Sequence, residues 1–473
     1  MLPSPMYYYG IVSIIVCLVI LLKSEGNRRK STKALEEAKD RQKTVERTQY
    51  YHCGSNLPTM ALLTKKLAKL NSDSATYHVS LIKLGRTNPL FRSIEECVDP
   101  MQDLVRRINK RFNPFALAVH DNEYLIMAFV SQTEMNQSEA KNLQKKIMGN
   151  LPKSVDFFGT PVPIDYAISS LSLTSRSSIF GIEKVERRLS FDMQKALSRV
   201  DGIFYHNEKL YKQEMFNKHI AKEIETSLSR GGKDFSVVLQ PIYEATSTDT
   251  PYSFESLIRW KNKANVGPGV FIPVISQIPH LHYRITKLMI SRVISVFQKM
   301  EERGIKLVPI SINISSEDLA TEGFAKMVEE QFSSHRQFMP YVIFEVIETE
   351  KLALSQTVKA NMDELINEGI SFAIDDFGSG YANFELLKNP YIKYLKIDKQ
   401  YAKSILDQKS NDNLLLDCMI DLCHKVGRKV VVEGIEEYQQ YKYLQDYSPV
   451  FLQGYYFCAP VKPIEALKMC SKT

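Results

Sequence analysis

Two adjacent aspartates, Asp375 and Asp376, end an apolar run in the segment AIDDFGSGY, residues 373–381. Neighbouring carboxylates repel each other and raise each other's pKa, so the pair requires an explanation. One interpretation is a strand end that runs into a solvated loop. The other is a site for a divalent cation, whose charge would offset the repulsion. The choice depends on whether other strands end in matching groups.

Eight short apolar runs in the C-terminal half carry polar groups near their ends. The runs are SVVLQPIY, SFESLIRW, VPISINIS, VIFEVIE, FAIDDFG, YLKIDKQ, KVVVEGIE and FLQGYYF. Helical patterns such as VKANMDELINEG lie between most of them and end in glycine, as helices often do. Strands that alternate with helices in this way predict an α/β fold with a C-terminal (β/α)8 barrel of the TIM type.

In such a barrel the strand ends meet at one face, where active sites lie. The polar residues near these ends are Gln240, Glu255, Asn313, Glu345, Asp375, Asp376, Lys396, Asp398, Glu433 and Gln453. So many acids are hard to explain as packing, because buried charges are costly unless they are paired or bind a metal. Oxygen donors without cysteine or histidine suit Mg²⁺ or Mn²⁺. Two such ions could support phosphodiester hydrolysis, with Lys396 as a fixed charge near the attacking water and Arg259 as a phosphate clamp.

The same motifs resemble those of a known family. FESLIRW is similar to the E-A-L motif of the EAL phosphodiesterases, with Ser256 in place of the alanine. SINIS, EVIE, DDFGSGY, KID, VEGIEE and QGYYF resemble the remaining motifs of that family in order and spacing. The resemblance runs from about Phe235 to the C-terminus. It implies hydrolysis of the bacterial second messenger cyclic di-guanylate (c-di-GMP) to linear pGpG, with Mg²⁺ or Mn²⁺ as cofactor and two ions expected.

The resemblance also implies roles for individual residues. The metal ligands would be Glu255, Asn313, Glu345, Asp375, Asp376 and Glu433. The catalytic set would be Glu255, Lys396, which would help position the nucleophilic water, and Glu433, a candidate general base. Gln240, Arg259 and Gln453 would hold the substrate. Glu348 and Asp398 would support the loop after DDFGSGY, which in the family couples dimerisation to metal binding. Ser256, Ile347 and Ser379 depart from the family's usual residues, and none of these changes removes a ligand.

Residues 6–22 are uncharged and almost wholly apolar, which predicts one transmembrane helix. The basic residues that follow place the remaining chain on the cytoplasmic side of the inner membrane. A cleavable signal peptide is the alternative, but a positive n-region and a small-residue cleavage site are missing. Residues 23–50 are rich in helix formers and opposite charges, and they predict a helical stalk.

Residues 51–212 alternate strand-like and helix-like runs, SFDMQKALSRVDGIFYH among the helix-like ones, and predict a mixed α/β domain. A connecting helix is expected at 213–235 and the barrel at 236–473. HDNEY, residues 120–124, at a hairpin tip resembles an eroded GGDEF motif of diguanylate cyclases. His120 and Asp121 replace the two glycines that let the backbone approach GTP, and Lys83 stands where a metal-binding aspartate is expected. We therefore expect no cyclase activity from this GGDEF-like domain. It would serve in regulation or dimerisation and could bind GTP or a regulatory protein.

Composition narrows the expected partners. The net charge of +7 comes without a basic block interleaved with aromatic residues, so no nucleic-acid partner is expected. Seven scattered cysteines without a CxxC pair indicate a reducing compartment. The leading hypothesis is a membrane-anchored, homodimeric phosphodiesterase in bacterial signal transduction. Two alternatives stay open: a non-catalytic c-di-GMP receptor, and a protein-interaction adaptor.

Overall fold

The computed structural model describes residues 38–41, 44–45, 47–52, 56–68, 76–85, 98–120, 124–131, 137–157, 160–174, 182–347, 355–378, 389–406 and 412–471. They fall into two compact units, divided between Gln213 and Glu214. The predicted membrane helix at 6–22 lies outside the described residues, as does most of the predicted stalk. Among the residues that are described, no helix is long and apolar enough to cross a membrane.

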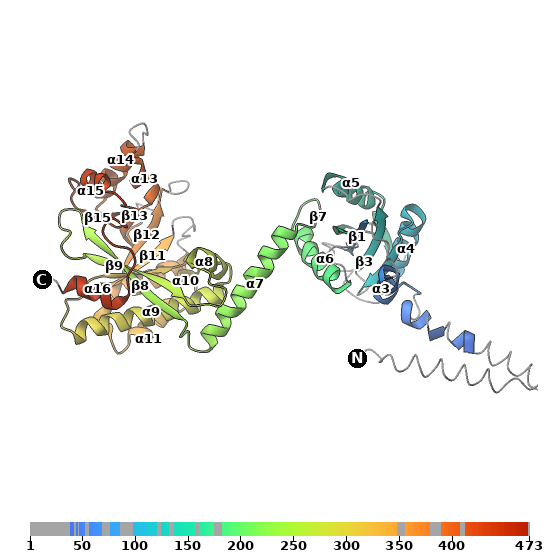
Figure 1. Ribbon diagram of the computed structural model, residues 1–473, viewed down its shortest axis with the longest axis horizontal. Coiled ribbons are helices and arrows are strands. Elements are labelled where there is room, and N and C mark those ends of the chain that lie inside the picture. The colour runs from blue at the N-terminus through green and yellow to red at the C-terminus, as the bar shows by residue number, and fades with distance from the viewer. Residues whose placement is uncertain are drawn as a thin grey trace, which may run out of the picture. The chain divides into compact units, whose positions relative to one another are not determined.

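Unit 1 is the N-terminal unit (Figure 1). It is built on a five-stranded sheet with the order β2-β3-β1-β6-β7. Its strands are β1 (Thr76–Leu84), β2 (Ala116–His120), β3 (Tyr124–Ser131), β6 (Tyr166–Thr174) and β7 (Ile203–Tyr205), and a separate hairpin comprises β4 (Ser154–Phe157) and β5 (Thr160–Pro163). Its helices are α3 (Met60–Ala68), α4 (Val98–Phe112), α5 (Gln137–Met148) and α6 (Ile182–Leu197). The predicted mixed α/β character of this unit is therefore confirmed.

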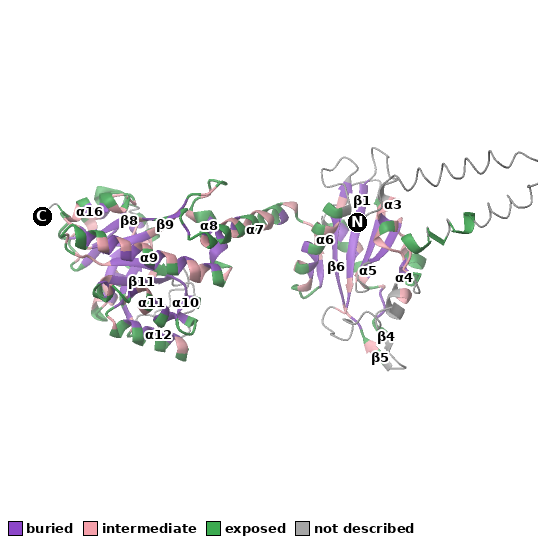
Figure 2. Ribbon diagram, turned by 90° about the horizontal axis from the view of Figure 1, so that it is seen from below, coloured by how far each residue is buried: buried purple, intermediate pink, exposed green. Residues whose placement is uncertain are grey.

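The two faces of this sheet carry separate apolar cores because successive strand residues point to opposite sides. On β1, Ile82 and Leu84 belong to the cluster that includes Ile108 of α4, whereas Val79 and Leu81 belong to the other cluster. Both faces are thus covered by helices. Figure 2 shows the strands of this unit as largely buried.

One prediction in unit 1 is wrong in its extent. The segment SFDMQKALSRVDGIFYH was expected to be one helix, but α6 ends at Leu197 and β7 begins at Ile203. Gly202, with a φ of 63°, takes the left-handed conformation between them. The predicted hairpin around HDNEY is present, since His120 pairs with Tyr124, although residues 121–123 lie outside the described part of the chain.

Helix α7 (Glu208–Ser229) is continuous across the division between the units. It covers much of the predicted connecting helix. Ile220 and Ile224, in its second half, are fully buried in the core cluster of the barrel unit.

Unit 2, the C-terminal unit, is a closed eight-stranded barrel with the order β10-β11-β12-β13-β14-β15-β8-β9. The strands are β8 (Phe235–Glu244), β9 (Ser253–Trp260), β10 (Ile310–Ile314), β11 (Val342–Ile347), β12 (Ser371–Phe377), β13 (Ile392–Ile397), β14 (Lys429–Val432) and β15 (Val450–Leu452). All eight predicted strands are confirmed, as is the barrel.

The barrel departs from an all-parallel arrangement at β8. This strand pairs antiparallel with both β9 and β15, whereas the pairs from β9 through β15 are parallel. Only residues 245–252 connect β8 to β9, which is too short for a crossover helix and favours an antiparallel pair. In this pair Gln240 lies opposite Glu255, so both reach the same region of the barrel.

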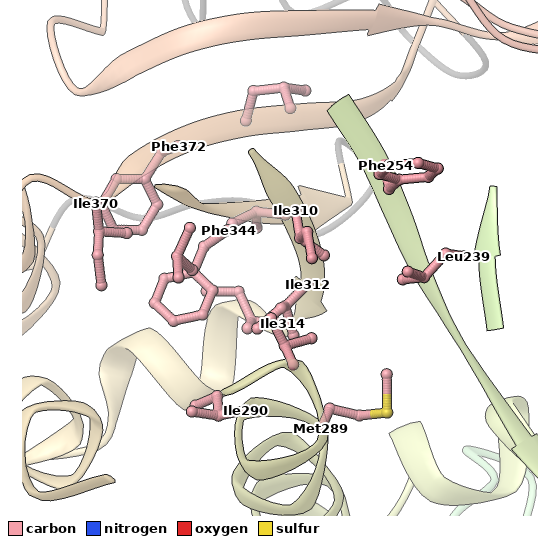
Figure 3. Close-up of a cluster of buried hydrophobic side chains, with 14 of the residues drawn as sticks. Leu239, Phe254, Met289, Ile290, Ile310, Ile312, Ile314, Phe344, Ile370 and Phe372 are labelled. Carbon is pink, nitrogen blue, oxygen red and sulfur yellow. The ribbon is translucent and has the colours of Figure 1, made fainter. Parts of the chain in front are cut away.

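Helices and apolar side chains enclose the barrel. The helical elements are α8 (Pro268–Ser276), α9 (Pro279–Glu302), α10 (Ser316–Ala320), α11 (Phe324–Phe332), the 3₁₀ helix η2 (Arg336–Tyr341), α12 (Gln356–Asn367), α13 (Lys399–Ser404), α14 (Asp412–Lys425), α15 (Tyr438–Leu444) and α16 (Pro463–Cys470). Figure 3 shows Ile310, Ile312 and Ile314 of β10 in one apolar cluster with Met289 and Ile290 of α9. Because side chains alternate along a strand, the residues between these isoleucines face the barrel interior.

Candidate active site at the mouth of the barrel

Lys396, on β13, is the centre of the predicted site. Its side chain is 1% exposed. Its Nζ lies within ion-pair distance of carboxylate oxygens from four different chain positions: 2.7 Å from Glu433, 2.9 Å from Asp375, 3.0 Å from Glu345 and 3.5 Å from Glu255. Four acids that are far apart in sequence are therefore brought to one buried cation.

Burial and charge act in opposite directions on these groups. Burial favours the neutral amine of Lys396, but the surrounding carboxylates raise its pKa well above the usual value, so it carries a charge. Burial is also the largest influence on Glu433 and raises its pKa to about 8. Burial also raises the pKa of Glu345 well above its usual value. Lys396 and, to a smaller degree, the Ser311 hydroxyl lower that pKa but do not offset the effect of burial. One ammonium group thus does not fully compensate the negative charge of the cluster.

Asp375 and Asp376 share the barrel mouth because β12 contains an irregularity. Ile374 pairs with Leu395 and Phe377 with Ile397, so the two aspartates lie opposite the single residue Lys396. Asp376 has a φ of 54°, in the left-handed region that aspartate tolerates better than most residues. This is a β-bulge, a feature often found beside active sites, where it redirects a side chain.

The bulge allows two consecutive residues to contribute to one cluster. Oxygen atoms of Asp375, Asp376 and Glu433 lie within 4.8 Å of one another. Burial, and after it Asp375 and Asp398, raise the pKa of Asp376 to about 6. This crowding of carboxylates is the arrangement that a bound cation would relieve.

Side-chain amides line the opposite part of the site. Gln453 Nε2 donates hydrogen bonds to Glu255 Oε2 at 2.7 Å and to Gln240 Oε1 at 3.2 Å. Asn313 Nδ2 donates to Glu255 Oε1 at 3.1 Å. Both oxygens of Glu255 are therefore held by amides, and Gln240 and Gln453 lie next to the carboxylates.

The remaining three predicted residues lie at the edge of the carboxylate cluster or outside the described residues. Arg259 donates to the carbonyl oxygen of Ile258 and lines a cavity of about 240 Å³, whose wall also includes Asn313. Asp398 caps α13 by accepting a hydrogen bond from the Gln400 backbone, and it faces Asp376. Glu348, together with the loop that it was expected to support, lies outside the described residues.

Sequence reasoning did not single out the layer of side chains beneath the site. Seven strand residues, each two positions along the chain from a site residue, line a small internal cavity: Ile242, Ser253, Ser311, Ile343, Ala373, Tyr394 and Val431. A separate pair, His282 and Asp318, lies beside the larger cavity, with His282 Nδ1 and Asp318 Oδ2 2.9 Å apart. The alternation of strand side chains could have identified the first group from its spacing. No sequence signal links His282 to Asp318.

The donor set fits a hard divalent cation. The groups at the mouth are carboxylates and one amide oxygen, which suit Mg²⁺ or Mn²⁺ better than zinc. Asp375, Asp376 and Glu433 form the tightest group, and Asn313 lies exposed at the end of its strand. Glu255 and Glu345 lie 3.5 Å and 3.0 Å from Lys396 Nζ, next to this group.

The fold and the site together define the class of protein: an α/β barrel with carboxylates gathered at the ends of its parallel strands. Comparison with protein families is more specific. Residues 221–460 match the EAL domain. The chain belongs to the EAL domain family.

Several curated proteins from bacteria are similar to part of the chain. The biofilm architecture maintenance protein MbaA of Vibrio cholerae is 27% identical over 281 residues, covering 57% of this chain and 35% of MbaA. The probable cyclic di-GMP phosphodiesterase PdeG of Escherichia coli is 28% identical over 217 residues, covering 46% of this chain and 42% of PdeG. The cyclic di-GMP phosphodiesterase PdeL of the same species is 26% identical over 258 residues, covering 54% of this chain and 70% of PdeL. The chain therefore spans less than half the length of MbaA and PdeG.

The fold also occurs among solved structures. The EAL enzyme Bd1971, in its cAMP and cyclic-di-GMP bound form, aligns with a TM-score of 0.50 and 20% identity, covering 66% of this chain and 82% of Bd1971. At this level of identity the likeness concerns the fold alone.

Proposed function

We propose that this chain is a c-di-GMP phosphodiesterase that hydrolyses its substrate to linear pGpG with Mg²⁺ or Mn²⁺. The observation that carries the proposal is the buried Lys396 ammonium among four carboxylates, beside the bulged pair Asp375 and Asp376. The relatives PdeG and PdeL, which are named for this activity, support it.

The proposed reaction needs a water molecule, a base and a means of stabilising charge on the phosphate. Divalent ions, of which we propose two, would supply positive charge to the phosphoryl oxygens and to the departing oxygen. Glu433 would accept the proton of the attacking water. Lys396 would hold Glu433 and Asp375 in place and would add a fixed positive charge beside them.

Substrate binding would involve the polar rim of the site. Gln240 and Gln453 would offer amide groups to the sugar-phosphate ring, since Gln453 bonds both Gln240 and Glu255 at the edge of the carboxylate cluster. Arg259 would pair with a phosphate, because its guanidinium lines the cavity that Asn313 also borders.

The test is a hydrolysis assay with the protein from about residue 51 onward. Incubation with c-di-GMP and Mg²⁺ or Mn²⁺ should yield pGpG, measured by chromatography, and EDTA should abolish it. Glu255→Ala and Asp375→Ala should remove the activity. Glu317→Ala, which changes an exposed acid on α10, serves as the matched control and should leave the rate unchanged.

Other outcomes would identify the two alternative functions. Tight dinucleotide binding without product would indicate a non-catalytic receptor. Neither binding nor product would overturn the proposal and favour a protein-interaction adaptor.

We also propose roles for the parts of the chain that precede the barrel. Residues 6–22 would anchor the protein in the inner membrane with the barrel in the cytoplasm, which their apolar composition and the following basic residues support. Removing them should move the protein from the membrane fraction to the soluble fraction.

Residues 51–212 would act as a GGDEF-like regulatory or dimerisation module without cyclase activity, and GTP is a candidate ligand. Sedimentation of the protein with and without this segment tests the expected homodimer. Titration with GTP tests the ligand.

A further inference from the structure

The barrel interior beneath the proposed active site contains a layer of side chains that are not among the proposed metal ligands or catalytic residues. On β10, β11 and β13 the residues two positions before Asn313, Glu345 and Lys396 are Ser311, Ile343 and Tyr394. They face the same interior because strand side chains alternate with a period of two. This layer therefore lies directly beneath the site residues in the barrel interior.

A small cavity separates the two layers. It has a volume of about 10 Å³ and is lined by Glu345 and Lys396 from the site and by Ser311 and Tyr394 from the layer below. All four of these residues are at most 5% exposed. A cavity of this size holds about one water molecule, provided that two or more polar groups are available to bond it.

The Ser311 hydroxyl provides the clearest evidence that such a water belongs there. Its side chain is 2% exposed and lies close enough to the Glu345 carboxylate to lower the pKa of that group. Its Oγ nevertheless makes no hydrogen bond of good geometry to any residue that the structure describes. A buried hydroxyl without a well-oriented partner is costly, and a bridging water is the usual solution. The carboxylate of Glu345 and the ammonium of Lys396 face the same cavity and are 3.0 Å apart.

The floor of the cavity is closed by a hydrogen-bonded group of aromatic residues. Tyr394 and Tyr252 have their hydroxyl oxygens 3.0 Å apart, and Lys429 Nζ donates to the Tyr252 hydroxyl at 2.8 Å. The Tyr252 ring packs on Phe451 with 4.1 Å between ring centroids.

We infer that Ser311 is a positioning residue, which holds Glu345 through one buried water in the cavity above Tyr394. The Ser311 hydroxyl and the Glu345 carboxylate would share this water, so that the carboxylate keeps one orientation beside Lys396. Partners behind a metal ligand commonly fix its orientation, and their loss weakens metal affinity or activity by about 10–100-fold. The inference rests on the proposed metal-dependent function, because it gives Glu345 the role of a ligand.

Metal binding without substrate tests the inference directly. Mg²⁺ and Mn²⁺ affinity is measured by calorimetry for the parent protein and for Ser311→Ala. We expect the variant to bind the cation about tenfold more weakly while the unfolding midpoint changes little. Ser236→Ala, which alters an exposed serine of β8, is the matched control and should bind like the parent.

A second pair of variants separates the hydroxyl from the volume of the side chain. Ser311→Thr and Ser311→Val have nearly the same shape, but only threonine keeps a hydroxyl. The threonine variant should bind the cation more tightly than the valine variant. A crystal structure of the parent should show one ordered water between Ser311 and Glu345.

The two possible failures are distinguishable. If the parent binds neither cation, the proposed function itself fails. If the parent binds and Ser311→Ala binds equally well, or if no water occupies the cavity, the positioning role of Ser311 is wrong while the proposed function stands.

Discussion

Lys396 Nζ lies 2.7 Å from Glu433 Oε1, the shortest of the four ion pairs that this buried lysine makes. The two residues come from β13 and from the turn after β14, neighbouring strands of the barrel. Replacing Lys396 by methionine would leave two buried carboxylates, Glu255 and Glu345, and the two half-buried ones without their cation. Breaking a buried ion pair costs about 3–5 kcal/mol, so we expect Lys396→Met to lower the free energy of unfolding by that order in EDTA. Urea unfolding measures this loss.

The matched control for this change is Lys393→Met, on the same strand but exposed. It should leave stability within about 0.5 kcal/mol of the parent. Added Mg²⁺ should restore part of the stability of Lys396→Met, since it replaces positive charge. Equal stability of both variants in EDTA would contradict the role of Lys396 as the charge centre.

Cation binding should release protons near neutral pH. In the metal-free site the pKa of Glu433 is raised to about 8 and that of Asp376 to about 6. At pH 7 Glu433 is therefore mostly protonated and Asp376 mostly ionised, so binding should release about one proton. Affinity should rise about tenfold per pH unit between pH 6 and pH 8 because the ionised form binds. Calorimetry in two buffers with different ionisation enthalpies counts the proton, and Glu433→Gln should abolish most of its release. A pH-independent affinity would refute this account.

Asp376 should respond differently to asparagine and to alanine. Its φ of 54° favours asparagine or aspartate over alanine, for which the left-handed conformation costs about 1–2 kcal/mol. Both substitutions remove a proposed metal ligand and should reduce hydrolysis strongly. In EDTA, however, Asp376→Asn should be at least as stable as the parent, because it removes repulsion from Asp375, and Asp376→Ala should be about 1 kcal/mol less stable than Asp376→Asn.

Asn265→Ala provides a control for the backbone strain alone. Asn265 is exposed, and its φ is 50°. The substitution should cost a similar free energy of unfolding without loss of hydrolysis. If Asp376→Ala and Asp376→Asn are equally stable, the bulge does not require a residue that tolerates positive φ.

Gly454 places Gln453 by a close approach of two backbone segments. A Cβ at this position would overlap the backbone of Ile435, including its carbonyl oxygen. Gly454→Ala should therefore displace the segment that carries Gln453, lower stability by about 1–3 kcal/mol and reduce hydrolysis. Gly269→Ala on α8 has open space around the new methyl group and should be neutral or slightly stabilising. Thermal unfolding and the hydrolysis assay measure both effects.

The stability of unit 1 should fall in mild acid because of His78. This side chain is 0% exposed, and burial lowers its pKa to about 4 from 6.5. Above pH 6.5 the imidazole is neutral in both the folded and the unfolded chain, so it contributes no pH dependence. As the pH falls towards 4 only the unfolded chain binds the proton, which costs up to about 3 kcal/mol of stability. Hydrogen exchange of the β1 amides at pH 7 and pH 4.5 measures this change.

His78→Gln should remove that part of the acid sensitivity. His219→Gln, which alters an exposed histidine of α7, should retain it. If both variants and the parent lose protection equally, another group is responsible. The candidates in this unit are Asp192, His206 and Glu208, which contact one another and have shifted pKa values.

Much of the barrel could be predicted from sequence because its signals are local. Each strand is a short apolar run, and each run carries a polar residue near its end, as with Glu345 and Lys396. The ends of parallel strands meet at one face of a barrel. The positions of the acids near the strand ends were therefore enough to predict that they lie close together. The α6–β7 boundary was missed because the turn at Gly202 interrupts a run with helical composition.

The amino-acid sequence by itself determined which residues could form the site: the carboxylates, the amides and the lysine at strand ends. The tertiary structure alone decided how they meet. Three features arise from the pairing of segments that are not adjacent in the chain. They are the direction of β8, the bulge that places Asp376 beside Asp375, and the cavity lined by Ser311 and Glu345. Periodicity reports the face on which a side chain lies. Register, and the depth to which a side chain reaches, depend on how all eight strands close together.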